Sequence, residues 1–412
     1  MCRDTATAPM VQEAFQAARG IIRQGVSPWG GSFPRGLSVD KRGDDQVSKQ
    51  GLYYPGPDDA WARRPPAELG MSVDGLREAI EHARSHEIGG PRDPRPLLTA
   101  FEKPPYNEIL GPTRERGDTS GLVLRHGYIA AEWGGPARVD MTFSATKSYL
   151  SLVAGLAWDA GRIRDVHDFV RDTVRDGRFE PPHNSEITWH HLLQQTSEWE
   201  GTLFGIPDLV DRNRSLGEAG GAAKGTHRDL RAPGTFWEYN DVRVNLLGVA
   251  LLHVWGEPLP DVLKRHVMDP IDASSEWQWH GYRNSWVEVN GKRMQSVPGG
   301  AHWGGGIWIS TFDHARIGYL LLRRGAWAGQ QIVSREWIER STTPCEVHRT
   351  YGYMWWLNTD RMLYPAASPA SFAAQGAGGN VVLIEPEHDL VVVTRWVSDV
   401  AGVIERVVAA IA

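Results

Sequence analysis

The sequence predicts an α+β fold, in which one antiparallel sheet is flanked by helices from the two ends of a domain and a mostly helical insertion separates its strands. Strand-like segments occur at residues 121–134 and 381–397, with helix-like segments between them. The last twelve residues, AGVIERVVAAIA, have the pattern of a closing helix. Strands near both ends that share one sheet are typical of this class.

Composition indicates an ordinary globular protein. The 412 residues are 41% hydrophobic and 23% charged, with a net charge of -6, so a large core is feasible and nucleic acid is not an expected partner. The only cysteines, Cys2 and Cys345, argue against a disulfide framework. No secretory signal and no run of 18 apolar residues is visible. We therefore expect a cytoplasmic protein without a membrane partner.

We expect an N-terminal arm followed by one domain that has two parts. The arm is rich in glycine, proline and aspartate and has room for one helix, VQEAFQAARGIIRQ. The arm covers residues 1–70, the domain 71–412, its α/β part about 71–143 and 345–412, and its helical part about 144–344.

Within the domain, local signals define each element in turn. Ser72 is a good N-cap for a helix over 71–86, and a hairpin turns near His126 and Gly127. A helix over 144–160 follows and ends at Gly161. Further segments are expected as helices at 187–196, 244–256 and 314–325, as a strand at 352–358, and as a hairpin turning at 386–389.

The stretch TFSATKSYLSLVAG (142–155) places one lysine on an apolar helix. Only seven of the 44 basic residues are lysines, and unlike arginine a desolvated lysine can lose its proton. Ser144 and Lys147 are three residues apart, so they share one helix face. This favours a serine nucleophile activated by a neutral Lys147. A second pair with this spacing, Ser38/Lys41, lies in the arm and is interpreted as coincidence.

Two further segments have ordinary explanations when each is taken alone. Tyr239, within PGTFWEYNDVRVNLLG (233–248), could be a core tyrosine, or it could relay a proton between lysine, serine and leaving group. Glycines 376, 378 and 379 in FAAQGAGGNVV could mark a hairpin edge, or a strand that lets a substrate approach the backbone.

In this order, the three segments resemble the serine β-lactamase and penicillin-binding-protein superfamily. The similarity is to class C β-lactamase-like esterases and amide hydrolases, including 6-aminohexanoate-dimer hydrolases, over about 70–412. It implies a class C β-lactamase-like fold and a serine hydrolase that cleaves carboxylic esters or simple amides through an acyl-enzyme on Ser144. Lys147 and Tyr239 would then manage the proton, and the backbone N–H groups of Ser144 and Ala377 would form the oxyanion hole.

One departure from the superfamily pattern concerns the tyrosine motif, usually Tyr-x-Asn. Here Tyr239 is followed by Asn240 and Asp241, both expected near the substrate. A carboxylate at the third position would oppose a neutral Lys147 if it reached the amine. It could instead orient the lysine or bind a substrate amine.

A second departure concerns the expected substrate contacts. Gln375 and Gly376 stand where the superfamily usually has a lysine-threonine-glycine motif, so no cation is offered to a substrate carboxylate. Trp199 and Trp237 are expected as apolar walls. The sequence therefore favours small neutral or amine-bearing esters and amides over carboxylate-bearing β-lactams as substrates.

Several alternatives stay open. On the same fold, the chain could be a β-lactamase, a D-Ala-type peptidase or an acyltransferase. A non-catalytic ligand-binding receptor is a further possibility, which the intact Ser144, Lys147 and Tyr239 disfavour. His302 is expected near the pocket. No metal motif is present, so neither a metal nor another cofactor is expected.

Overall fold

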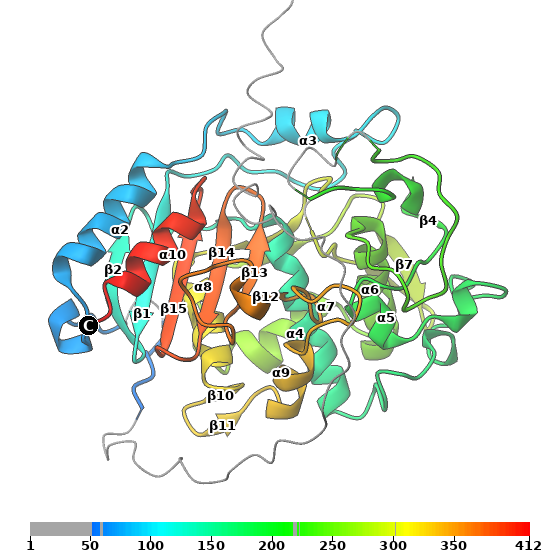
Figure 1. Cartoon of the computed structure of the whole chain (residues 1–412). Helices are drawn as coiled ribbons and strands as arrows, with labels where there is room; N and C mark the ends of the chain where they lie inside the picture. The colour runs from blue at the N-terminus through cyan, green and yellow to red at the C-terminus, as the bar shows by residue number, and fades with distance from the viewer. Residues whose placement is uncertain (1–51, 58–60, 217–220, 222, 301) are drawn as a thin grey trace, which may run out of the picture.

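In a computed structural model, the chain has helices on both faces of one antiparallel sheet, beside a region of helices and loops (Figure 1). The described residues are 52–57, 61–216, 221, 223–300 and 302–412. The helix expected in the arm and the Ser38/Lys41 pair lie outside them.

Six antiparallel strands form the main sheet, in the order β12-β13-β14-β15-β1-β2. They are β1 (Ser120–Arg125), β2 (Tyr128–Trp133), β12 (Trp356–Leu357), β13 (Phe372–Gly376), β14 (Asn380–Glu385) and β15 (Leu390–Arg395). Strand β1 pairs with β15, with Ser120 opposite Arg395. The predicted sheet shared by both ends of the domain is confirmed, as are the two hairpins that turn at 126–127 and 386–389.

Period-two alternation along the strands places apolar side chains on both faces of the sheet. Val123 packs with helices α2 and α10, whereas Leu122 and Leu124 pack with the core that contains α8. Figure 1 shows α2 and α10 together over one face, with α8 behind the strands. Helix α2 begins after the predicted N-cap Ser72. The helices are α2 (Val73–Ser85), α8 (Thr311–Leu322) and α10 (Val400–Ala409).

The region beside the sheet is centred on α4, which carries the serine-lysine stretch. Every residue from Thr146 to Ala157 is buried, because α4 contacts α6, α7 and α9. The helices here are α3 (Arg95–Phe101), α4 (Thr146–Asp159), α5 (Trp189–Leu193), α6 (Asp241–Trp255), α7 (Leu259–Leu263), the π-turn η7 (Lys264–Met268) and α9 (Arg335–Ser341). Within the described residues, no single helix is both long and apolar enough to cross a bilayer; only α6 with α7–η7, bent by 71°, meets that test as a pair.

This region contains more strand than the sequence predicts, because strands of two to four residues are too short for their alternation to be recognised. They are β3 (Asp140–Met141), β4 (Thr202–Leu203), β5 (Ile206–Pro207), β6 (Gln278–His280), β7 (Trp286–Val289), β8 (Lys292–Gln295), β9 (Gly306–Ile309), β10 (Ala326–Trp327) and β11 (Gln330–Gln331). Conversely, the strand expected over 352–358 shrinks to β12, because Met354 has φ 61° and breaks the extended run.

Candidate active site

Ser144 lies in a strained turn at the start of α4. The 3-10 turn η3 (Phe143–Ala145) leads directly into that helix. Phe143 has φ 48°, a left-handed conformation that costs energy for a bulky side chain. Its ring packs edge-on against Trp396, with centroids 6.1 Å apart. The turn therefore holds a half-buried Ser144 at the positive end of the α4 dipole.

Lys147 lies one turn further along α4, and its side chain is only 2% exposed. Its Nζ donates a hydrogen bond to Oγ of Ser144 at 3.0 Å. The structure therefore brings together the two residues whose spacing suggested a nucleophile and its activating group.

Asp241, the first residue of α6, sets the charge of Lys147. Its Oδ1 lies 2.5 Å from the lysine Nζ. Burial lowers the pKa of Lys147, but the charge of Asp241, its hydrogen bond to the amine and the nearby Tyr239 together leave that pKa above its ordinary value. The carboxylate that the sequence places at the third motif position therefore does reach the amine, and this contact opposes the expected neutral Lys147.

Tyr239 lies beside this ion pair. The face of its ring is 4.6 Å from Lys147 Nζ and 5.1 Å from Cζ of Arg214. Both are cation–π contacts. Tyr239 is buried, its hydroxyl has no hydrogen-bond partner among the described residues, and it does not line the cavity next to Ser144. Trp237 packs at a tilt against Tyr239, with centroids 6.1 Å apart.

Both carboxylate oxygens of Asp241 are occupied. Oδ2 accepts a hydrogen bond from Arg214 Nη1 at 3.1 Å and lies 2.8 Å from Nδ1 of His302. Burial favours the neutral acid, but Lys147 and Arg214 outweigh it and hold the pKa of Asp241 well below its ordinary range. Asp241 is therefore a counter-ion and has no free oxygen for a substrate amine.

His302 connects this ion pair to a second buried set of charges. Its Nε2 lies 2.6 Å from Oε1 of Glu102, and its Nδ1 lies 3.7 Å from Oδ2 of Asp211. Burial lowers the pKa of His302, but Asp211 and Asp241 outweigh burial and raise it above the ordinary value.

Glu102, Asp211 and His302 together offer three ligand atoms within 4.8 Å of one another, the spacing of a metal site. However, Lys224 Nζ is ion-paired with Glu102 and lies 3.2 Å from Asp211. The lysine ammonium thus already supplies positive charge to two of the three groups, which makes these residues a poor fit for a cation.

Sequence reasoning missed four members of this buried cluster: Glu102, Asp211, Arg214 and Lys224. Lys224 carried a usable signal, since it belongs to the same small set of lysines that pointed to Lys147. The two acids and the arginine had no signal, because charged residues in loops are normally solvated. Their burial is a product of the tertiary fold.

Strand β13 brings the glycine segment against the Ser144 turn. A Cβ on Gly376 would lie 2.1 Å from the carbonyl oxygen of Thr142 and 3.2 Å from the Ser144 nitrogen. Only glycine fits there, because the absence of a side chain lets the β13 backbone approach the backbone of the Ser144 turn closely. Ala377, the next residue, lines the cavity together with Ser144. Gln375 and Gly376, both expected near the substrate, are half-buried and do not line this cavity.

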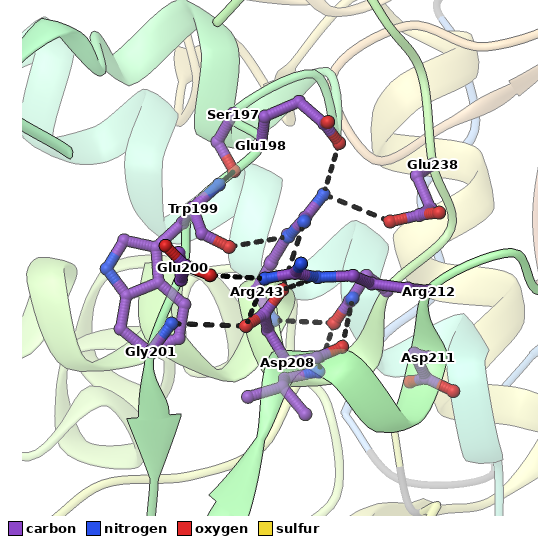
Figure 2. A network of polar contacts seen from close by, with 12 residues as sticks. Ser197, Glu198, Trp199, Glu200, Gly201, Asp208, Asp211, Arg212, Glu238 and Arg243 are labelled. Carbon is purple, nitrogen blue, oxygen red and sulfur yellow. Dashed lines mark hydrogen bonds and ion pairs between the residues drawn. The ribbon is translucent and has the colours of Figure 1, made fainter. Parts of the chain in front are cut away.

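The structure does not bring Asn240 or Trp199 to the cavity, contrary to expectation. Asn240 caps α6, accepting hydrogen bonds from the N–H groups of Val242 and Arg243. Trp199 is buried, and its carbonyl accepts from Arg243 within an ion-pair network that includes Glu198 (Figure 2). Both positions serve the local fold.

Trp237 also lies off the cavity lining. Its ring stacks on His348, with centroids 3.8 Å apart. It reaches the site only through its contact with Tyr239.

A cavity of about 110 Å³ opens above Ser144. Five charged or titratable residues border it: Arg92, Arg116, Arg214, Asp241 and His302. Most of the remaining lining is apolar and comes from residues 88–101, from Phe143 and from Trp396. Ser144 therefore faces a space that suits an uncharged, apolar group.

The Asp241→Asn variant is expected to lower the free energy of unfolding by about 3–5 kcal/mol, because removing one partner strands buried cations. Urea denaturation monitored by tryptophan fluorescence measures this change. Asp74→Asn is the matched control: Asp74 pairs with Arg77 on the surface, and its loss should cost less than about 1 kcal/mol. Equal effects of the two substitutions would contradict a structural role for the buried pair.

Curated proteins match part of this chain. A putative D-alanyl-D-alanine carboxypeptidase of Escherichia coli O157:H7 is 23% identical over 194 residues, covering 39% of this chain and 45% of that relative. The chain spans about half the length of the curated relatives it matches.

Two solved structures share the fold. A putative 6-aminohexanoate-dimer hydrolase from Bacillus anthracis aligns with a TM-score of 0.50 and 16% identity, over 86% of this chain and 87% of its own. EstCE1, a hydrolase with promiscuous acyltransferase activity, aligns with a TM-score of 0.52 and 15% identity, over 82% and 98%. At these identities the likeness shows the fold alone. The sequence also matches the Beta-lactamase family over residues 120–396. Since this match spans more than half of the chain, the chain belongs to the Beta-lactamase family, a family of β-lactamase-fold hydrolases.

Proposed function

We propose that the chain is a serine hydrolase that cleaves neutral carboxylic esters or simple amides through an acyl-enzyme on Ser144. One observation carries this proposal: Ser144, which lines a largely apolar cavity, accepts a hydrogen bond on Oγ from the buried ammonium of Lys147. A binding protein has no use for a charged donor aimed at a serine hydroxyl.

In the proposed acylation step, Oγ of Ser144 attacks the substrate carbonyl carbon. Its proton passes to the Tyr239 hydroxyl, while the proton of that hydroxyl passes to the departing oxygen or nitrogen. Lys147 remains an ammonium and stabilises the negative charge that develops on Oγ. The carbonyl oxygen becomes an oxyanion, for which the backbone N–H groups of Ser144 and Ala377 are the proposed donors.

Deacylation reverses the same transfers. Water attacks the acyl carbonyl, its proton passes to the Tyr239 hydroxyl, and the hydroxyl's own proton returns to Oγ of Ser144. An alcohol or amine in place of water would give acyl transfer.

Charge pairing supports a neutral substrate. Among the described residues that line the cavity, Arg92 pairs with Asp118, Arg116 with Glu87, and Arg214 with Asp241. These ion pairs offset the positive charge beside the cavity, although Nε of Arg116 and Nε of Arg214 have no hydrogen-bond partner among the described residues. The occupied Asp241 likewise removes the expected attraction for a substrate amine.

A substrate panel tests the proposal. We expect kcat/KM for a short neutral nitrophenyl ester to exceed that for a chromogenic cephalosporin, and for a D-Ala-D-Ala peptide, by at least about tenfold. Measuring kcat/KM for a nitroanilide with the same acyl group and for a linear amide allows amides to be compared directly with the ester. A cephalosporin or peptide value equal to the ester value would restore the β-lactamase or peptidase alternative. Added alcohol measures the share of acyl transfer.

A further inference from the structure

The apolar wall of the cavity comes mainly from a segment that lies outside the family match. Residues 88–101 precede residue 120, where that match begins. The wall is made by six side chains: Ile88, Pro91, Pro94, Leu97, Leu98 and Phe101. Ser144 and Lys147 thus lie within the region that matches the family, whereas the segment that forms most of the apolar cavity lining lies before it.

Contacts at both ends fix the position of this wall. At its start, the Ile88 N–H donates to the Trp396 carbonyl at 3.0 Å, and the Ile88 carbonyl accepts from Arg116 at 3.0 Å. At its end, the Phe101 ring packs edge-on against His302, with centroids 4.4 Å apart. Glu102, directly after it, is paired with the same histidine. The wall is thus held against the site.

We propose that this segment selects substrates whose acyl group is short and apolar, about three to five carbons long; this inference rests on the proposed function. The acyl group is the part that stays bonded to Ser144 Oγ, and Ser144 lines the cavity. A cavity of about 110 Å³ is somewhat smaller than the ~150 Å³ cavity that holds benzene in another protein. Longer chains must extend into solvent.

A series of nitrophenyl esters from acetyl to octanoyl tests this selectivity. We expect kcat/KM to rise about fourfold per methylene up to a chain of four or five carbons, which corresponds to ~0.8 kcal/mol per buried CH₂, and then to level off or fall. A parallel series of acetate esters with alcohols of increasing length should stay nearly flat. A flat acyl profile, or a dependence carried by the alcohol instead, overturns the inference.

Variants of the wall separate selectivity from folding. Leu98→Ala should move the preferred acyl length upward, and Leu98→Trp should move it downward toward acetyl. Ala100→Trp is the control, because Ala100 is exposed on the same helix and does not line the cavity. An unshifted optimum in both Leu98 variants would overturn the assignment. If no ester or amide is hydrolysed at all, the proposed function is wrong. If esters are hydrolysed but the preferred acyl length does not shift in the variants, only the inference about acyl-chain selectivity is wrong.

Discussion

The Ser144→Ala variant is expected to fold normally and to lose at least four orders of magnitude in kcat on any ester or amide that the parent protein hydrolyses. The reason is that alanine removes the atom that forms the acyl bond, and in serine hydrolases this loss alone removes nearly all catalysis. Steady-state kinetics, together with mass spectrometry after a fluorophosphonate probe, measure the effect. The parent protein should carry the label on the peptide that contains residue 144.

Ser151 provides a matched control on the same helix. It is buried like its neighbours, and its hydroxyl has no hydrogen-bond partner among the described residues. Ser151→Ala should therefore keep both activity and labelling. A label at Ser38, or residual turnover of more than about one per cent in Ser144→Ala, would contradict the assignment of the nucleophile.

The Lys147→Met variant is expected to lower kcat about a thousandfold. Methionine keeps the approximate volume but removes the charged donor to Ser144 Oγ, and loss of one such donor in a desolvated site typically costs 10²–10³-fold. The kinetics of Lys264→Met serve as control, since Lys264 pairs with Asp269 on the surface. Activity in Lys147→Met within tenfold of the parent would remove Lys147 from the mechanism.

The pH profile distinguishes the two possible roles of Lys147. Its pKa is raised above the ordinary value of about 10.5, so it is an ammonium throughout the neutral range. If the ammonium is the working form, its contribution is fully present at neutral pH and is lost only above that pKa. A neutral base would instead give kcat/KM that rises about tenfold per pH unit between pH 7 and 9. We expect no such rise.

Patterns within single segments predicted the elements of the fold that they encode. The alternating runs on either side of 126–127 and 386–389 became hairpins, and the apolar stretch after Ser144 became a buried helix. The two-residue strands could not be predicted, because their pairing is set by distant partners. β3, for example, is defined by β9, more than 160 residues later.

The same distinction holds for the site. The serine-lysine spacing is a local property of one helix, and it predicted a contact that the structure contains. The charge of Lys147 depends on Asp241, and that of His302 on Asp211, all brought together by tertiary folding. Trp199 illustrates the opposite error, since its aromatic character suggested a cavity wall, but its ring is buried and its carbonyl accepts a hydrogen bond from Arg243 (Figure 2).

The segment that forms the apolar wall is held at both of its ends, and it lies apart in the chain from the residues proposed to carry out the reaction. The fixed points are Ile88, held by backbone hydrogen bonding to Trp396, and Glu102, held by the buried charges. Residues 89–100 lie between them and contribute none of the ion pairs that surround Lys147. We therefore expect that this segment, which includes most of helix α3, can be replaced by a segment of different sequence while Lys147 and its counter-ions stay in place, which would change substrate preference if the proposed function holds.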